Sequence, residues 1–116
     1  MPGEDSGGAA SAQDRGVRVQ LLYFDGCPSW QVADARLREA LQTLGRPAEV
    51  EKVLVATPEE AEHWNFRGSP SVLVDGEDPF PQSRTPVGLT CRLYPTPEGL
   101  GGSPTVDQLV DVLSRA

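Results

Sequence analysis

Residues 17–55 contain a strand-like, a helix-like and a second strand-like segment in direct succession. Residues 17–24 pass from alternating to continuous apolar side chains, which is typical of a strand buried on both faces. In residues 30–44 apolar side chains recur every three or four positions, which predicts an amphipathic helix that ends at Gly45. Residues 48–55 again combine alternation with an apolar end, as a strand does. This order predicts a βαβ unit in a mixed or parallel sheet.

Four further elements follow this unit. A Thr-Pro-Glu-Glu motif at 57–60 predicts the start of a short helix, which Gly68 ends. Residues 71–74 predict a third strand, and residues 89–94 a fourth that runs antiparallel to it, with a Pro- and Gly-rich loop between them. A Ser-Pro-Thr motif begins the last helix, in residues 103–113. The chain therefore alternates strands and helices, as α/β proteins do.

The length of the chain, 116 residues, suits one domain and is too short for two. Residues 1–15 have no hydrophobic period and cannot contribute to a packed core. We therefore expect a disordered leader over residues 1–15 and a single domain over residues 16–116.

The net charge of the chain disfavours some classes of binding partner. Seventeen acidic against ten basic side chains give a net charge of −7, which disfavours nucleic acid and anionic lipid as partners. No apolar run approaches the roughly 20 residues of a membrane helix, and the acidic opening is unlike a signal peptide. We therefore expect a cytoplasmic protein without nucleic-acid or membrane partners. Two cysteines and one histidine are too few for a typical zinc site, so we expect no metal and no cofactor.

Three local motifs, in this order, resemble the thioredoxin-like superfamily. They are Phe-Asp-Gly-Cys-Pro at 24–28, Arg-Gly-Ser-Pro-Ser-Val at 67–72, and a Gly-rich loop that leads into the last helix. The resemblance covers the chain from about Val17 to its C-terminus. It implies a thioredoxin-like α/β fold with a central mixed four-stranded sheet flanked by three helices. It also implies that Pro70 follows a cis peptide bond and lies beside a reactive Cys27.

Cys27 stands where the first predicted strand gives way to a helix. Unpaired N–H groups and the positive end of the helix dipole favour thiolate over thiol, and so lower the pKa of a cysteine in this position. The thiolate is the nucleophile toward disulfides, peroxides and soft electrophiles. The flanking Asp-Gly and Pro-Ser pairs predict a surface turn, which favours a reactive Cys27 over a buried, inert one.

The resemblance breaks down at the second cysteine. Redox members of the superfamily carry Cys-x-x-Cys, whereas this chain has Cys-Pro-Ser-Trp at 27–30. In one explanation, Cys91 is a remote resolving thiol. In another, Cys27 acts alone, with glutathione or another low-molecular-weight thiol as the second sulfur. In the third, catalysis has been lost and the fold serves as a binding module. The sequence separation of the two cysteines does not choose among these explanations.

Cys91 lies in the fourth predicted strand. If Leu89, Cys91 and Leu93 share one face of that strand, Cys91 points into the core and is inert, and Arg92 faces outward. This interpretation is favoured because free cysteines are commonly buried. Trp30 is interpreted as the first core residue of its helix, with the wall of a substrate groove as the alternative.

The sequence predicts a thioredoxin-like protein with thiol–disulfide or related redox activity, a candidate thiol-dependent oxidoreductase. Its substrate would be a thiol or disulfide, on a protein or on a low-molecular-weight compound. The alternatives are a non-catalytic binding module and thiol-based handling of mercury or organomercurials. The candidate catalytic residues are Cys27 and Cys91. The candidate substrate-binding residues are Pro28, Trp30, Ser69 and Pro70.

Overall fold

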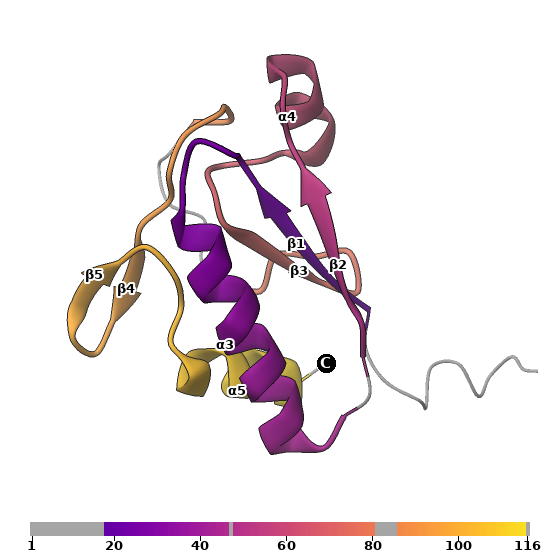
Figure 1. Cartoon of the computed structure of the whole chain (residues 1–116), viewed down its shortest axis with the longest axis vertical. Coiled ribbons are helices and arrows are strands. Elements are labelled where there is room, and N and C mark those ends of the chain that lie inside the picture. Colours follow the sequence, from indigo (N-terminus) through magenta and orange to yellow (C-terminus); the bar gives the residue numbers. More distant parts are fainter. Residues whose placement is uncertain (1–17, 47, 81–85, 116) are drawn as a thin grey trace, which may run out of the picture.

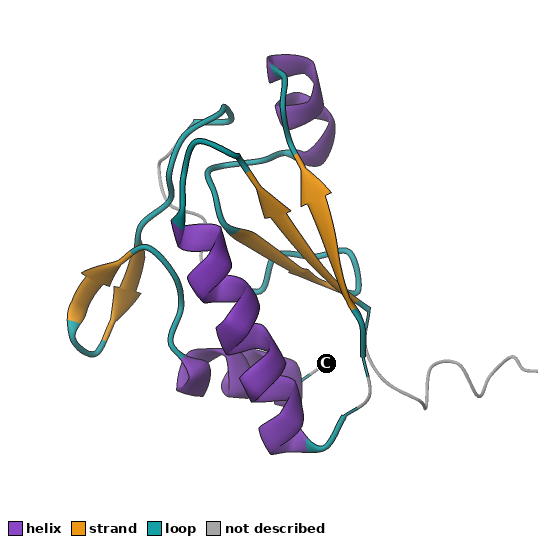
Figure 2. Cartoon of the chain, viewed as in Figure 1, coloured by secondary structure: helices purple, strands orange, loops and turns teal. Residues whose placement is uncertain are grey.

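The computed structural model describes residues 18–46, 48–80 and 86–115. The predicted leader over residues 1–15 lies outside the described residues. The described elements, in chain order, are β1 (Val19–Tyr23), α3 (Ser29–Leu44), β2 (Val50–Leu54), α4 (Pro58–Trp64), β3 (Ser71–Val74), β4 (Tyr94–Thr96), β5 (Gly99–Gly101) and α5 (Val106–Ser114). Strands and helices alternate along most of the chain (Figure 2), so the predicted α/β class is confirmed.

The central sheet has β1 in its middle, with β2 on one side and β3 on the other. β1 and β2 run parallel, with Val19 opposite Val50, and they are joined by α3. β1 and β3 run antiparallel, with Val19 opposite Val74. The βαβ unit and the mixed sheet predicted from the sequence are both confirmed (Figure 1).

A fourth strand of the central sheet is not present among the described residues. Residues 89–94 do not pair with β3. Instead, Cys91 forms a single parallel bridge with Ser69, which precedes β3, and β4 pairs with β5 in a separate two-stranded sheet. The backbone groups of residues 90 and 92 are instead hydrogen-bonded to Ser69, before β3 begins, and at the other end of the strand Val74 exchanges hydrogen bonds with Glu77 of the turn that follows.

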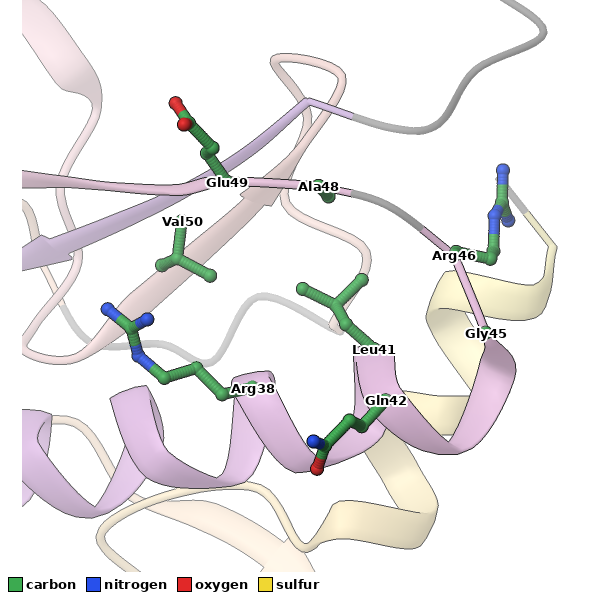
Figure 3. A pocket seen from close by; sticks show the side chains of 8 residues that line it. All are labelled: Arg38, Leu41, Gln42, Gly45, Arg46, Ala48, Glu49 and Val50. Carbon is green, nitrogen blue, oxygen red and sulfur yellow. The ribbon is translucent and has the colours of Figure 1, made fainter.

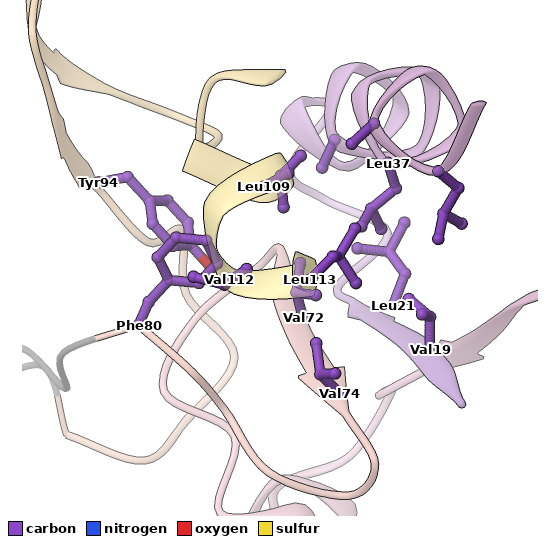
Figure 4. Packing of buried hydrophobic residues seen from close by; sticks show 13 residues of the cluster. Val19, Leu21, Leu37, Val72, Val74, Phe80, Tyr94, Leu109, Val112 and Leu113 are labelled. Atoms are coloured by element: carbon purple, nitrogen blue, oxygen red, sulfur yellow. The ribbon is translucent and has the colours of Figure 1, made fainter. Parts of the chain in front are cut away.

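Neighbouring residues of β1 and β3 point to opposite faces of the central sheet. Each face is covered, because residues on both faces are buried. Leu21 and Val72 belong to the larger core, which α3 and α5 cover (Figure 4). Leu22 and Leu73, the next residues along, belong to a second core on the other face. The second core is completed by residues in and around α4 and by the segment that follows the undescribed residues 81–85, namely Val55, Ala61, Phe66, Val87 and Leu89.

The helix starts agree with the sequence, and one helix end does not. Thr57 and Thr105 cap α4 and α5, each in a reciprocal capping box with the residue three positions on. α3 ends at Gly45, whose left-handed backbone is typical of a C-cap. α4 ends at Asn65 and not at Gly68, because Asn65 itself adopts the left-handed conformation that closes a helix. None of the described helices combines the length and the apolar content that a membrane crossing requires.

Replacement of Leu37 tests the larger core. Leu37 is fully buried between α3 and the sheet, so Leu37→Ala removes apolar contacts and leaves a cavity. We expect the free energy of unfolding, measured in urea, to fall by about 2 to 5 kcal/mol. Glu39→Ala, at an exposed position of the same helix, is the control and should change it by less than about 0.5 kcal/mol. Equal losses in the two variants would contradict the assignment of this helix face to the core.

Candidate functional site

The two cysteines of the chain, 64 positions apart in sequence, lie together in the structure. Their Sγ atoms form a disulfide and their Cα atoms are 5.9 Å apart. This separation lies within the range of roughly 4.4 to 6.8 Å that disulfides require. The structure therefore brings together the two residues predicted to be catalytic.

Cys27 is positioned by the turn between β1 and α3. Its backbone N–H donates to the carbonyl of Phe24 at 3.0 Å, which closes the turn at the end of β1. α3 starts two residues later, with Pro28 as its N-cap and no side-chain hydrogen bond at the cap. The predicted position of Cys27 at a helix N-terminus is confirmed. The predicted exposure is not, because the turn around it is exposed but Cys27 itself is only 2% exposed.

Cys91 reaches Cys27 because residues 90–92 run beside Ser69. The Ser69 N–H donates to the Thr90 carbonyl at 2.7 Å, and the Arg92 N–H donates to the Ser69 carbonyl at 2.9 Å. These two bonds hold Cys91 opposite Ser69. The Sγ atom of Cys27 in turn lies 3.6 Å from the Ser69 carbonyl oxygen. Ser69 is thus the residue that both cysteines adjoin.

The peptide bond between Ser69 and Pro70 is cis, as the resemblance implies. Both residues are buried, and the Tyr94 hydroxyl donates to the Pro70 carbonyl at 2.5 Å. The Ser69 hydroxyl is buried as well, and it has no hydrogen-bond partner among the described residues. Buried polar groups are usually paired, so an unpartnered hydroxyl on the residue whose carbonyl adjoins Cys27 needs a chemical explanation.

The predicted orientation of residues 91 and 92 is wrong. Cys91 is exposed, and the Arg92 side chain, which was expected to face outward, is 2% exposed. Arg92 turns inward because it has partners there. Its Nη1 atom lies 2.6 Å from a carboxylate oxygen of Asp78 and 3.4 Å from the Ser71 hydroxyl, and its guanidinium lies 4.5 Å from the centre of the Tyr94 ring.

Tyr94 completes this buried cluster. Desolvation by burial raises the pKa of its hydroxyl well above the ordinary value, against the lowering effect of the Arg92 charge. Tyr94 therefore stays protonated and can donate to Pro70. Sequence reasoning missed this cluster. The sequence offers one sign of this cluster. Residues 91–94 alternate between two faces, and Tyr94, which shares its face with Arg92, is a large side chain that favours burial as Leu93 does on the other face.

The structure supports the core interpretation of Trp30 over the groove wall. The Trp30 ring stacks on Tyr23 of β1, with ring centroids 4.4 Å apart, and lies 5.9 Å from the Lys52 ammonium of β2. Trp30 also packs against the larger core. Pro28, by contrast, is exposed at the start of α3. Of the four predicted substrate-binding residues, Pro28 directly follows Cys27 in the chain, and Ser69 contacts Cys27 and pairs with Cys91.

A surface hollow lies where α3 ends and β2 begins, away from the cysteines (Figure 3). Its volume is about 820 Å³, its apolar lining is formed by Leu41, Ala48 and Val50, and Arg38 and Glu49 also line it. Arg46, at its rim, donates to the Leu113 carbonyl at 2.7 Å and so ties α3 to α5. This hollow holds no nucleophile or metal-ligating cluster. Within the described ranges, no three His, Cys, Asp or Glu side chains gather as metal ligands do.

Gly68 allows the close approach of residues 90–92 to Ser69, and its replacement tests this approach. Its φ is +116°, and an added Cβ would lie 2.8 Å from the Arg92 Cβ and 3.1 Å from its Cα. We expect Gly68→Ala to lower the free energy of unfolding by about 1 to 3 kcal/mol more than Gly76→Ala does. Gly76, with a φ of +87° and nothing within 4 Å, is the matched control for backbone strain alone. Equal losses would show that the Arg92 backbone does not crowd this position.

The buried ion pair yields a second prediction. Asp78→Asn leaves the buried Arg92 charge without its carboxylate, and we expect the free energy of unfolding to fall by about 3 to 5 kcal/mol. Asp111→Asn removes an exposed pair with Arg115 and should change it by at most about 1 kcal/mol. Urea unfolding of the two variants measures the contrast, and a small loss in Asp78→Asn would contradict a stabilising role of the pair.

Comparison with known proteins identifies no family for this chain. No protein-family model matches it, and a search of curated proteins finds no match. The thioredoxin-like resemblance therefore stays a prediction that the sequence motifs carry, and function must be inferred from the cysteine pair itself.

Proposed function

We propose that this protein carries out thiol–disulfide exchange, with Cys27 and Cys91 as one redox pair, on a thioredoxin-like fold. The observation that carries the proposal is the adjacency of two cysteines 64 positions apart, with Cα atoms 5.9 Å apart. Of the three explanations for the missing Cys-x-x-Cys motif, this adjacency favours the remote resolving thiol. The burial of Cys27 argues against a cysteine that acts alone on external substrates.

Three further features support the thioredoxin-like part of the proposal. β1, α3 and β2 form a parallel βαβ unit, and β3 pairs antiparallel with β1. The cis bond before Pro70 lies beside Cys27, where the superfamily has its cis proline. Cys27 directly precedes the N-cap of a helix, and the resemblance places the reactive cysteine at such a helix start.

The position of the disulfide supports an exchange role over a purely structural one. Cys91 lies on an exposed part of the chain, so external thiols can reach the bond. The expected cytoplasmic location adds to this, because disulfides there are usually transient and serve catalysis or redox sensing. The exposed disulfide is therefore proposed to open and close in the folded protein.

The proposed thiol–disulfide exchange takes place in two steps, in which atoms and electrons balance. A substrate thiolate attacks one sulfur of the pair, forms a mixed disulfide and expels the other sulfur as a thiolate with the bonding electrons. A second substrate thiolate then attacks the substrate sulfur of the mixed disulfide and expels the first cysteine as a thiolate. Two substrate thiols become one disulfide, and the pair takes up two electrons. In the opposite direction, the reduced pair reduces a substrate disulfide.

The mercury alternative keeps one observation in its favour. Two adjacent thiolates suit a soft metal ion, and reduction of the pair would supply them. Cleavage of a carbon–mercury bond would also need a proton donor at the pair. The exchange function needs nothing beyond the two sulfurs, so it is preferred.

A redox titration tests the proposed function. Folded protein is equilibrated with mixtures of reduced and oxidised glutathione, quenched with acid, alkylated and weighed by mass spectrometry. We expect both thiols to appear together in one two-electron transition. Cys27→Ser and Cys91→Ser should each abolish that transition, and Cys27→Ser, which keeps the exposed Cys91, should carry a single glutathione instead.

Circular dichroism of the two variants checks that each remains folded, so that a lost transition reports on the chemistry. A pair that never closes, or a disulfide that glutathione opens only after denaturation, would contradict the exchange function. Either result would favour the binding module.

A further inference from the structure

The two cysteines of the disulfide differ in how far each residue is exposed to solvent. Cys27 is 2% exposed and lies against the Ser69 carbonyl, whereas Cys91 belongs to the exposed face of its segment. Thiol–disulfide exchange requires an attacking thiolate to approach one particular sulfur, and access is one factor that decides which. An external thiolate can approach Cys91, and the surrounding protein blocks the approach to Cys27.

From this asymmetry, and on the basis of the proposed exchange function, we infer that Cys91 is the sulfur that substrates attack and that Cys27 is the leaving thiolate, which the Ser69 hydroxyl stabilises. This reverses the roles that the sequence motifs imply. In the sequence-based view, Cys27 meets the substrate and Cys91 at most resolves the intermediate.

The position of Cys27 before a helix favours it as the leaving group. It precedes the first turn of the 16-residue helix α3, whose N-terminal N–H groups have no side-chain acceptor at the cap. Negative charge at such a helix end is stabilised. A sulfur whose thiolate is stabilised leaves faster in exchange.

The unpartnered Ser69 hydroxyl is the second, independent observation. Ser69 is fully buried, its carbonyl lies 3.6 Å from Cys27 Sγ, and its hydroxyl has no partner among the described residues while the disulfide is closed. A thiolate is a strong acceptor, and a disulfide sulfur is a weak one. Opening the bond creates a thiolate on Cys27, and rotation of the Ser69 side chain toward it gives this hydroxyl an acceptor that the oxidised protein lacks.

The first step then follows a defined course. A substrate thiolate attacks Cys91 Sγ, a bond forms between the substrate sulfur and Cys91, and the bond between Cys91 and Cys27 breaks. The bonding electrons leave with Cys27, and the Ser69 hydroxyl donates a hydrogen bond to the new thiolate. No proton is transferred in this step. The mixed disulfide is carried by Cys91, at the surface, where a second thiol can reach it.

Mapping of the mixed disulfide tests the assignment. Oxidised, folded wild-type protein is mixed with reduced glutathione, quenched with acid at a series of short times, alkylated and digested for mass spectrometry. We expect glutathione on Cys91 and the alkyl group on Cys27. Glutathione on Cys27, or on neither cysteine at any time during reduction, overturns the inference but leaves the exchange function intact. A protein that forms no disulfide overturns the proposed function instead.

Ser69→Ala tests the role of the hydroxyl. We expect glutathione to open the disulfide about tenfold more slowly in this variant, as for loss of a hydrogen bond to a charged group. The stability of the oxidised form should stay unchanged, because the hydroxyl has no partner there. Ser103→Ala is the control, since Ser103 is also buried but donates to the Pro104 carbonyl. An opening rate equal to that of wild type would overturn the role of Ser69.

Discussion

Two backbone hydrogen bonds between Ser69 and residues 90–92 determine most of what is distinctive in this protein. They place Cys91 opposite Ser69, and through it against Cys27. They depend on a glycine at position 68, because a side chain there would collide with the Arg92 backbone. Together with the ion pair of Arg92 with Asp78 and the hydrogen bond from Tyr94 to Pro70, this pairing fixes the segment where the two cysteines meet.

Sequence periodicity was enough to predict the central part of the fold. The apolar run of β1, the three- and four-residue spacing of α3 and the capping motif at Thr57 each correspond to an observed element. These signals are local, so they can be read from the chain directly. The place of residues 89–94 could not be predicted in this way, because it depends on the backbone pairing of residues 90–92 with Ser69. This pairing is a tertiary contact, and local sequence periodicity does not predict it.

The site was predictable to the same extent. The position of Cys27 follows from a strand that ends and a helix that begins, both of which are local. The orientation of Cys91 does not, because alternation divides residues 91–94 into two faces without saying which is buried. Hydrophobicity alone favours burial of Cys91 and Leu93. The structure buries Arg92 and Tyr94 instead, since Asp78 neutralises the guanidinium from across the loop.

The buried ion pair therefore bears on function through geometry more than through stability. Replacement of a buried ion pair by well-packed apolar side chains is often neutral for stability. In an extended segment, however, a shift of one residue turns every side chain to the opposite face. Arg92 and Asp78 oppose that shift, because the alternative register would bury Cys91 and turn the Arg92 guanidinium away from the Asp78 carboxylate. A charge that is costly to bury thus fixes which sulfur of the disulfide faces the solvent.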